Sequence, residues 1–147
     1  MEHVERTHRF VIQTLGPKFP EMIVAPDGEI AIRNGSATLY VSTKQGFGPT
    51  GTLLSMHSPL VHRLPMSPEL LRWSATDGRA YDLGGVYVVP SGDPGSCEVW
   101  LGHSFVGDEV DPGALLSTAY QLLVLADHLD DVIRDRFGGV RYHDRST

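Results

Sequence analysis

The chain contains a single cysteine, Cys97, in 147 residues. It can therefore form no disulfide within the chain, and no zinc site that needs several cysteines. Basic residues are also few. Twelve Lys and Arg stand against 18 Asp and Glu, which gives a formal net charge of −6. Because a nucleic-acid binder needs a basic surface to neutralise phosphates, this balance argues against DNA or RNA as a partner.

Long apolar runs are missing as well. The longest covers residues 122–126, far short of the roughly 20 residues that span a bilayer. Residues 1–6 lack the basic start and apolar stretch of a signal peptide. Together with the lone cysteine, these features predict a cytoplasmic protein with no membrane partner.

What remains is the composition of a globular domain. Hydrophobic residues make up 41% of the chain and charged residues 20%, so the chain can bury a core without disulfides. The 16 glycines and 10 prolines predict many turns between short elements. We expect a single domain over residues 1–147, with a core at about 4–139 and a C-terminal tail at 140–147.

Hydrophobic periodicity predicts an α+β protein. A first helix is expected at residues 2–15. A second helix begins at Ser67-Pro68, where Ser is a favourable N-cap and Pro a favourable first helical residue. Asn34-Gly35 predicts a hairpin with a type I′ turn. Extended segments are expected at residues 21–25, 29–33, 36–44, 52–61, 84–89 and 97–106.

A third helix is expected from Asp111 to about Phe137, ended by Gly138-Gly139. Its apolar residues recur at spacings of four and three, which places them on one stripe. Extra apolar residues in its first half, Val124 among them, indicate either deeper burial or contact with another chain. The predicted order is α-β-β-β-α-β-β-α, a single antiparallel sheet of about five strands with helices mainly on one face.

Two glycine-containing segments are similar to known site motifs but lack the structural setting or the spacing that those motifs require. Residues 46–51 match G-x-G-x-x-G, but a strand follows where a dinucleotide site needs a helix, so a hairpin loop is expected. Residues 102–107 are one residue too long for a nucleophile elbow. His103 in that segment is expected to be a partly buried structural histidine. No cofactor site is predicted.

The other titratable residues also favour structural roles. His57 and His62 point to opposite faces of a strand and are poor joint metal ligands. Asp127 and Asp131, at helical spacing, could pair as metal ligands or as acid and base. With Arg134 and Arg136 close by, they are expected instead to be solvated charges and ion pairs. Asp130 lies at the edge of the apolar stripe, and if buried it needs an Arg or backbone donors.

One feature points to binding. Alternation along the last long strand sends Trp100 and Val106 away from the helices, and Tyr40 and Tyr87 from other strands are expected to join Trp100. Such a face would present large aromatic side chains, as polypeptide interfaces do. The alternative is that a further helix covers it.

An ordered set of segments gives the chain a family likeness. These are residues 58–61, 67–71, 84–90, 100–108, 110–112, 125–131 and 136–139, and with them the chain resembles the YbjN / type III secretion chaperone-like family of actinobacteria. The resemblance covers about residues 4–139. It implies a chaperone-type domain that binds extended or partly unfolded segments of client proteins and is often dimeric. At Gly102 the chain departs from the family, whose members commonly carry a carboxylate there.

Three hypotheses follow. The first is a non-catalytic polypeptide-binding module that uses Tyr40, Tyr87, Trp100, Val106 and Val124. The second is a self-associating regulatory or structural domain whose apolar surface serves a homodimer. The third, a remote one, is an enzyme that uses His57, His103 and the late Asp residues.

Overall fold

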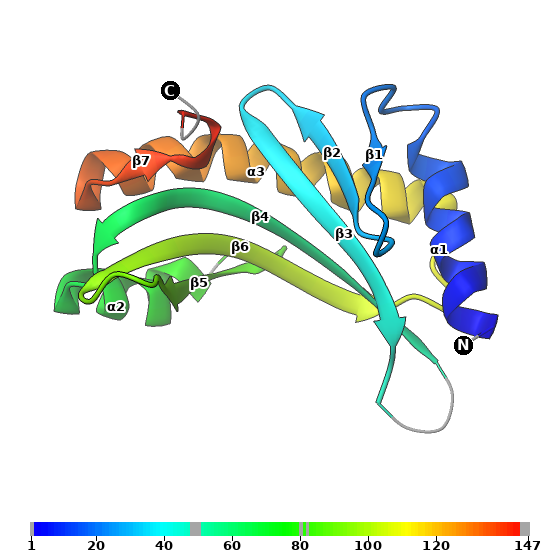
Figure 1. Ribbon diagram of the computed structural model, residues 1–147, viewed down its shortest axis with the longest axis horizontal. Helices are drawn as coiled ribbons and strands as arrows, with labels where there is room; N and C mark the ends of the chain where they lie inside the picture. The colour runs from blue at the N-terminus through cyan, green and yellow to red at the C-terminus, as the bar shows by residue number, and fades with distance from the viewer. Residues whose placement is uncertain (1, 48–50, 80, 82, 145–147) are drawn as a thin grey trace.

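The computed structural model describes residues 2–47, 51–79, 81 and 83–144, with the side chain of residue 79 excepted. One long helix, α3, runs behind a strongly curved antiparallel sheet, with α1 and α2 at opposite ends of the molecule (Figure 1). The elements in chain order are α1 (Glu2–Leu15), β1 (Ile23–Val24), β2 (Ile30–Asn34), β3 (Ala37–Gln45), β4 (Thr52–Pro65), α2 (Pro68–Ala75), η1 (Asp77–Arg79), β5 (Gly85–Pro90), β6 (Ser96–Val106), α3 (Pro112–Phe137), β7 (Val140–Arg141) and η2 (Tyr142–Asp144).

The sheet has the strand order β1-β2-β3-β4-β6-β5, and β7 pairs with β4 beside this row. The predicted α+β fold with one antiparallel sheet is confirmed. The sheet has seven strands rather than about five. β1 lies within the predicted extended segment 21–25, whereas β7 was not predicted, and each is only two residues long. Residues 140–144, expected in the tail, form β7 and the 3₁₀ turn η2.

The hairpin between β2 and β3 differs from the predicted type I′ turn. Asn34 pairs with Ala37, so Gly35 and Ser36 are the two central residues. Gly35 has a φ of 63°. Ser36 does not have a positive φ, since Arg63 is the single non-glycine residue with positive φ in the described chain. One positive φ at the first central position is the requirement of a II′-like turn, which Gly satisfies without steric cost.

Strand β4 lies at the centre of the sheet and is longer than predicted, extending to Pro65. It pairs with β6 along its length, with register shifts between Pro59 and Val61 and between Val61 and Leu64. On its other side, β3 pairs with residues up to His57, and β7 takes over at Val61 and His62. β7 therefore occupies the place beside β4 that β3 leaves vacant.

The helices cover one face of the sheet. α3 begins as predicted, because the Asp111 carboxylate accepts a hydrogen bond from the Ala114 amide at 3.0 Å, and it ends at Gly138 with φ 88°. Its predicted stripe is buried, apart from Phe137, which is half-buried and packs on the Trp73 ring of α2 at 5.5 Å. α2 begins at the predicted N-cap, where Ser67 Oγ accepts from the Leu70 amide at 3.1 Å.

The core is built from alternate strand residues and the helices that cover them. Strand positions in contact with the helices include Ile30, Ile32, Leu39, Val41, Leu54, Met56, Val86, Cys97, Val99 and Leu101. Because side chains alternate along a strand, the residues between these positions lie on the opposite face.

The G-x-G-x-x-G segment joins two strands, as predicted. The Gly46 amide donates to the Gly51 carbonyl at 3.0 Å, and β4 follows. Residues 48–50 of the motif lie outside the described residues.

Candidate functional site

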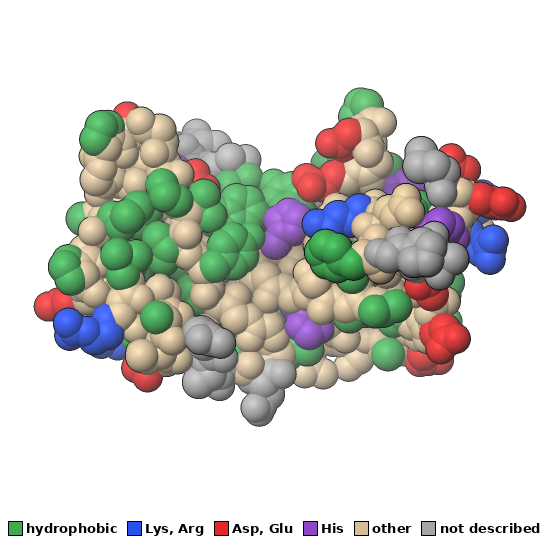
Figure 2. All heavy atoms as spheres, turned by 90° about the horizontal axis from the view of Figure 1, so that it is seen from below, with side chains coloured by type: hydrophobic (Ala, Val, Ile, Leu, Met, Phe, Trp, Pro, Cys, Tyr) green, Lys and Arg blue, Asp and Glu red, His purple; other side chains and the backbone are tan. Residues whose placement is uncertain are grey.

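The face of the sheet opposite the helices carries the candidate site. Tyr40 of β3, Tyr87 of β5 and Trp100 of β6 lie on it, as alternation predicted. In the described part of the chain, the three α-helices pack on the other face of the sheet. No α-helix of these residues covers the face that carries the aromatic side chains, so the predicted alternative of a covering helix is wrong for them. We call this surface the open face. In the view from below, hydrophobic side chains gather over the end of the molecule that holds α2 (Figure 2).

Three side chains from adjacent strands form an aromatic cluster on the open face. Tyr40 and His57 are cross-strand partners, and their rings stack 6.0 Å apart. Trp100 lies 5.6 Å from the His57 ring and 6.4 Å from the Tyr40 ring. Such spacings are typical of favourable aromatic pairs. The Trp100 indole N–H donates to Glu98 at 2.9 Å, which fixes the orientation of the indole.

Tyr87 extends this aromatic surface on the far side of Trp100, its partner across β5 and β6. Its side chain is 41% exposed. A Cβ at Gly102 would lie 2.8 Å from Tyr87 Cε1, so the ring lies directly over this glycine. The absence of a side chain at Gly102 allows the Tyr87 ring to pack this closely on the sheet.

A polar hollow adjoins the aromatic cluster. It has a volume of about 430 Å³, and its lining includes His57, Tyr87, Lys44, Ser55 and Ser104. The two serine hydroxyls lie 3.1 Å apart across β4 and β6. Hydrogen-bonding groups thus lie next to aromatic rings, the combination that polypeptide-binding surfaces use.

His57 favours the neutral state. Burial lowers its pKa from the ordinary 6.5, and Lys44 acts in the same direction, while Glu29, whose Oε2 lies 3.8 Å from His57 Nε2, opposes the shift. A neutral imidazole among aromatic rings can both donate and accept a hydrogen bond.

A fourth aromatic side chain, Tyr142 of η2, reaches the cluster from the C-terminal end of the chain. Its hydroxyl lies 2.9 Å from the Tyr40 hydroxyl, and its ring lies 6.5 Å from that of Trp100. Sequence reasoning missed Tyr142 because residues 140–147 were expected to form a tail. The only available signal was Val140-Arg141-Tyr142 directly after a pair of glycines.

The structure does not bring Val106 and Val124 into this cluster. Val106 ends β6, is 65% exposed, and lines a separate hollow with Phe47 and Leu53. Val124 lies on α3 and is 63% exposed. It lines an apolar hollow of about 550 Å³ with Tyr120, Leu125 and Tyr81. Val106 lies on the same side of the sheet as Trp100 but away from the cluster, so the five predicted site residues are divided among the aromatic surface and two other hollows.

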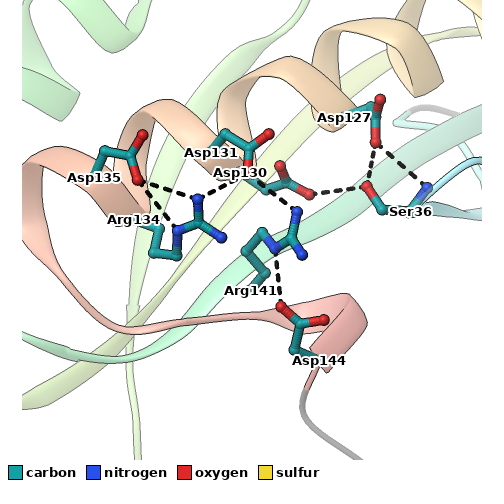
Figure 3. Close-up of polar contacts among 8 residues, drawn as sticks. All are labelled: Ser36, Asp127, Asp130, Asp131, Arg134, Asp135, Arg141 and Asp144. Carbon is teal, nitrogen blue, oxygen red and sulfur yellow. Dashed lines mark hydrogen bonds and ion pairs between the residues drawn. The ribbon is translucent and has the colours of Figure 1, made fainter.

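The late acidic residues form a network between α3, the β2–β3 turn and the C-terminal end (Figure 3). Asp131 pairs with Arg134 at 3.2 Å, as predicted, and with Arg141 at 3.1 Å. Arg141 also pairs with Asp144 at 2.9 Å. Arg136, the other predicted partner, instead places its guanidinium 5.1 Å from the centre of the Phe137 ring.

Asp130 is buried within this network. Its Oδ2 lies 3.3 Å from the Ser36 hydroxyl, which also donates to Asp127. The predicted donor was an Arg or the backbone, and the donor found is a serine. Burial and the nearby Asp131 raise the pKa of Asp130 to about 6, against the opposing effects of Ser36 and Arg141.

The residues of the remote enzyme hypothesis are only partly brought together, because His57 and His103 both line the polar hollow but the late Asp residues do not. His57 lies on the open face, the ring of His103 contacts that of Phe105 at 5.6 Å, and the late Asp residues lie along α3. Among residues 2–47, 51–79, 81 and 83–144, no group of three His, Cys, Asp or Glu is placed to hold a metal ion. In the same residues no helix is both long and apolar enough to cross a bilayer.

Comparison with protein families agrees with this geometry. The family model TY-Chap1, described as "T3SS (YopN, CesT) and YbjN peptide-binding chaperone 1", matches residues 5–145. The chain belongs to this family. The match confirms the resemblance found from the sequence, and it extends over β7 and η2. TY-Chap1 is a family of peptide-binding chaperone domains. No curated protein matches the chain.

Proposed function

We propose that this TY-Chap1 protein is a non-catalytic module that holds an extended segment of a client polypeptide against the open face. The observation that carries the proposal is the aromatic surface of Tyr40, Trp100 and Tyr87 on the side of the sheet away from the α-helices. Membership of a peptide-binding chaperone family supports it.

The surface fits an extended peptide better than a folded partner. It runs across four strands, β3, β4, β6 and β5, in the direction of the hydrogen bonds between them. Neighbouring strands are about 4.8 Å apart, so the surface offers side-chain sites at regular intervals. A peptide laid across it places its apolar residues on the rings and its polar groups in the hollow at Ser55 and Ser104.

The test is selection of peptides on the purified protein from a displayed library of random 12-residue sequences. Selected peptides are then measured by fluorescence titration against the wild type, Tyr87→Ala and Trp100→Ala. Truncation of a central aromatic residue at an interface typically costs about 2 kcal/mol. We therefore expect each variant to bind about 30-fold more weakly.

Val124→Ala is the matched control, because it removes an exposed apolar side chain from a different surface. Its affinity for the selected peptides should equal that of the wild type. The proposal fails if no peptide is selected, or if the selected peptides bind Trp100→Ala as well as the wild type.

Self-association is the second candidate. The hollow beside Tyr120 and Val124 is apolar and exposed on α3, as a homodimer surface would be. Light scattering of the wild type and Val124→Asp distinguishes the candidates: a dimer that Val124→Asp dissociates, without peptide binding, favours self-association.

We also propose that the protein acts in the cytoplasm. Its single cysteine is buried and unpaired, as in proteins of reducing compartments. Export of a reporter fused to the full chain would contradict this location.

A further inference from the structure

The C-terminal segment, defined as residues 140–144, lies on part of the proposed client site. β7 pairs with β4 at Val61 and His62, and Tyr142 joins the rings of Tyr40 and Trp100. The segment therefore does what an added client strand would do: it supplies main-chain pairing to an otherwise open part of a strand and an aromatic side chain to a cluster.

A rigid turn directs the segment back onto β4. Gly138 and Gly139 have φ values of 88° and 87°, which residues other than glycine adopt at a cost. A Cβ at Gly139 would lie 2.7 Å from side-chain atoms of both Leu64 and Val61. Only a glycine allows the chain to approach β4 this closely.

The strand pairing and the ion pairs of the segment are nevertheless limited. Its strand pairing covers two residues. Its ion pairs, Arg141 with Asp131 and Asp144, involve side chains that are between a quarter and a half exposed. Ion pairs at such sites contribute little to stability, since water and salt screen them. A competing peptide that makes these contacts and adds others on the open face, such as at the exposed Tyr87, can therefore displace the segment.

We infer that the C-terminal segment occupies the part of the client site beside β4 in the free protein, and that clients displace it with a basic residue followed by an aromatic residue. The inference rests on the proposed function. The aromatic ring of the client takes the place of Tyr142 against Tyr40 and Trp100, and its cation takes the place of Arg141 at Asp131. The net charge of −6 favours such a basic client over an acidic one.

The probe is a synthetic, end-capped and fluorescently labelled peptide with the sequence of residues 138–144, Gly-Gly-Val-Arg-Tyr-His-Asp. Its affinity for the full-length wild type and for Tyr142→Ala is measured by anisotropy. If the segment leaves the site in about a tenth of the wild-type molecules, the wild type binds the probe about tenfold more weakly than Tyr142→Ala does. His143→Ala, in the same segment but with an exposed side chain, should bind like the wild type.

Three further measurements serve as controls. Arg141→Ala removes the ion pairs but leaves Tyr142, and it should bind the probe about threefold more tightly than the wild type. A probe with Ala in place of Tyr should lose at least tenfold in affinity for Tyr142→Ala. Melting curves of all variants establish that they are folded.

Equal affinities of the wild type and Tyr142→Ala for the probe overturn the inference, as does a probe that fails to bind Tyr142→Ala. Binding of the library peptides distinguishes failure of this inference from failure of the proposed function. If they bind in a Trp100-dependent manner and Tyr142→Ala leaves their affinity unchanged, the proposed function stands and the inference falls. If no library peptide binds the wild type or Tyr142→Ala, both fall.

Discussion

The hydroxyl groups of Tyr40 and Tyr142 lie 2.9 Å apart, although 102 positions separate the two residues in the chain. This contact joins the third strand of the sheet to the last described turn. It links the candidate site to a part of the chain that shows no regular hydrophobic pattern.

Removal of either hydroxyl should loosen the C-terminal segment. A hydrogen bond of this kind contributes about 1 kcal/mol, so Tyr40→Phe and Tyr142→Phe should each speed hydrogen exchange at the β7 amides about fivefold. Because both variants break the same bond, the double variant should be no worse than either single one. Tyr120→Phe on α3 is the control, and additive effects of the two substitutions would contradict the contact.

Asp130→Asn should stabilise the protein at pH 7. The folded-state pKa of Asp130, about 6, lies above the ordinary 3.8, so the folded state binds the proton more tightly than the unfolded state. The stability that this group contributes is complete below about pH 3.8 and is lost as the pH rises through 6. At pH 7 a buried charge remains, and its removal should add up to about 2 kcal/mol to the free energy of unfolding.

Urea denaturation of the wild type and Asp130→Asn at pH 7 and pH 4 tests this. The difference between the two proteins should shrink at pH 4, where Asp130 is protonated. Asp135→Asn, on the exposed surface of α3, should show little change at either pH. A less stable Asp130→Asn protein at pH 7 would disprove the expectation.

Gly84→Ala should destabilise the fold by about 2 kcal/mol or more. Gly84 has φ 78°, and a Cβ there would lie 2.9 Å from the carbonyl oxygen of Gly102. Both the backbone conformation and the contact oppose a side chain. Gly92→Ala is the matched control, because a Cβ at Gly92 meets nothing within 4 Å. Thermal melting should separate the two variants clearly, and equal melting temperatures would count against this packing of β5 on β6.

Cys97 should resist thiol reagents in the folded protein. Its side chain is fully buried, and burial together with Glu98 raises the pKa of the thiol. Both effects lower the concentration of reactive thiolate. Reaction with a chromogenic disulfide at pH 8 should therefore follow the unfolding rate and reach one thiol per chain in denaturant. Rapid reaction of the folded protein would show that β6 opens locally.

The sequence predicted the parts of the fold that repeat over many residues. α3 was predicted with its N-cap Asp111 because 26 residues display one apolar stripe and clear end signals. Strand alternation likewise placed Tyr40, Tyr87 and Trp100 on one face. Such patterns are local, because they depend on residues close in the sequence and not on which distant segments pair with one another.

Features that depend on distant pairing were not predictable. β7 has two residues and η2 three, too few to show a period, and they form only because β4 offers a vacant place beside Val61. The extension of β4 to Pro65 depends on register shifts against β6, which interrupt the alternation on which the prediction relied. The partners of Asp130 come from a turn more than 90 positions away.

The turn at Gly138 and Gly139 also has a practical consequence for work with this protein. It brings the end of the described chain to Asp144, beside the open face, whereas Glu2 lies at the opposite end of the molecule (Figure 1). An affinity tag fused directly after Asp144 would crowd the surface on which a client is expected. A tag before α1 leaves that surface accessible, so N-terminal immobilisation is the suitable format for every capture assay.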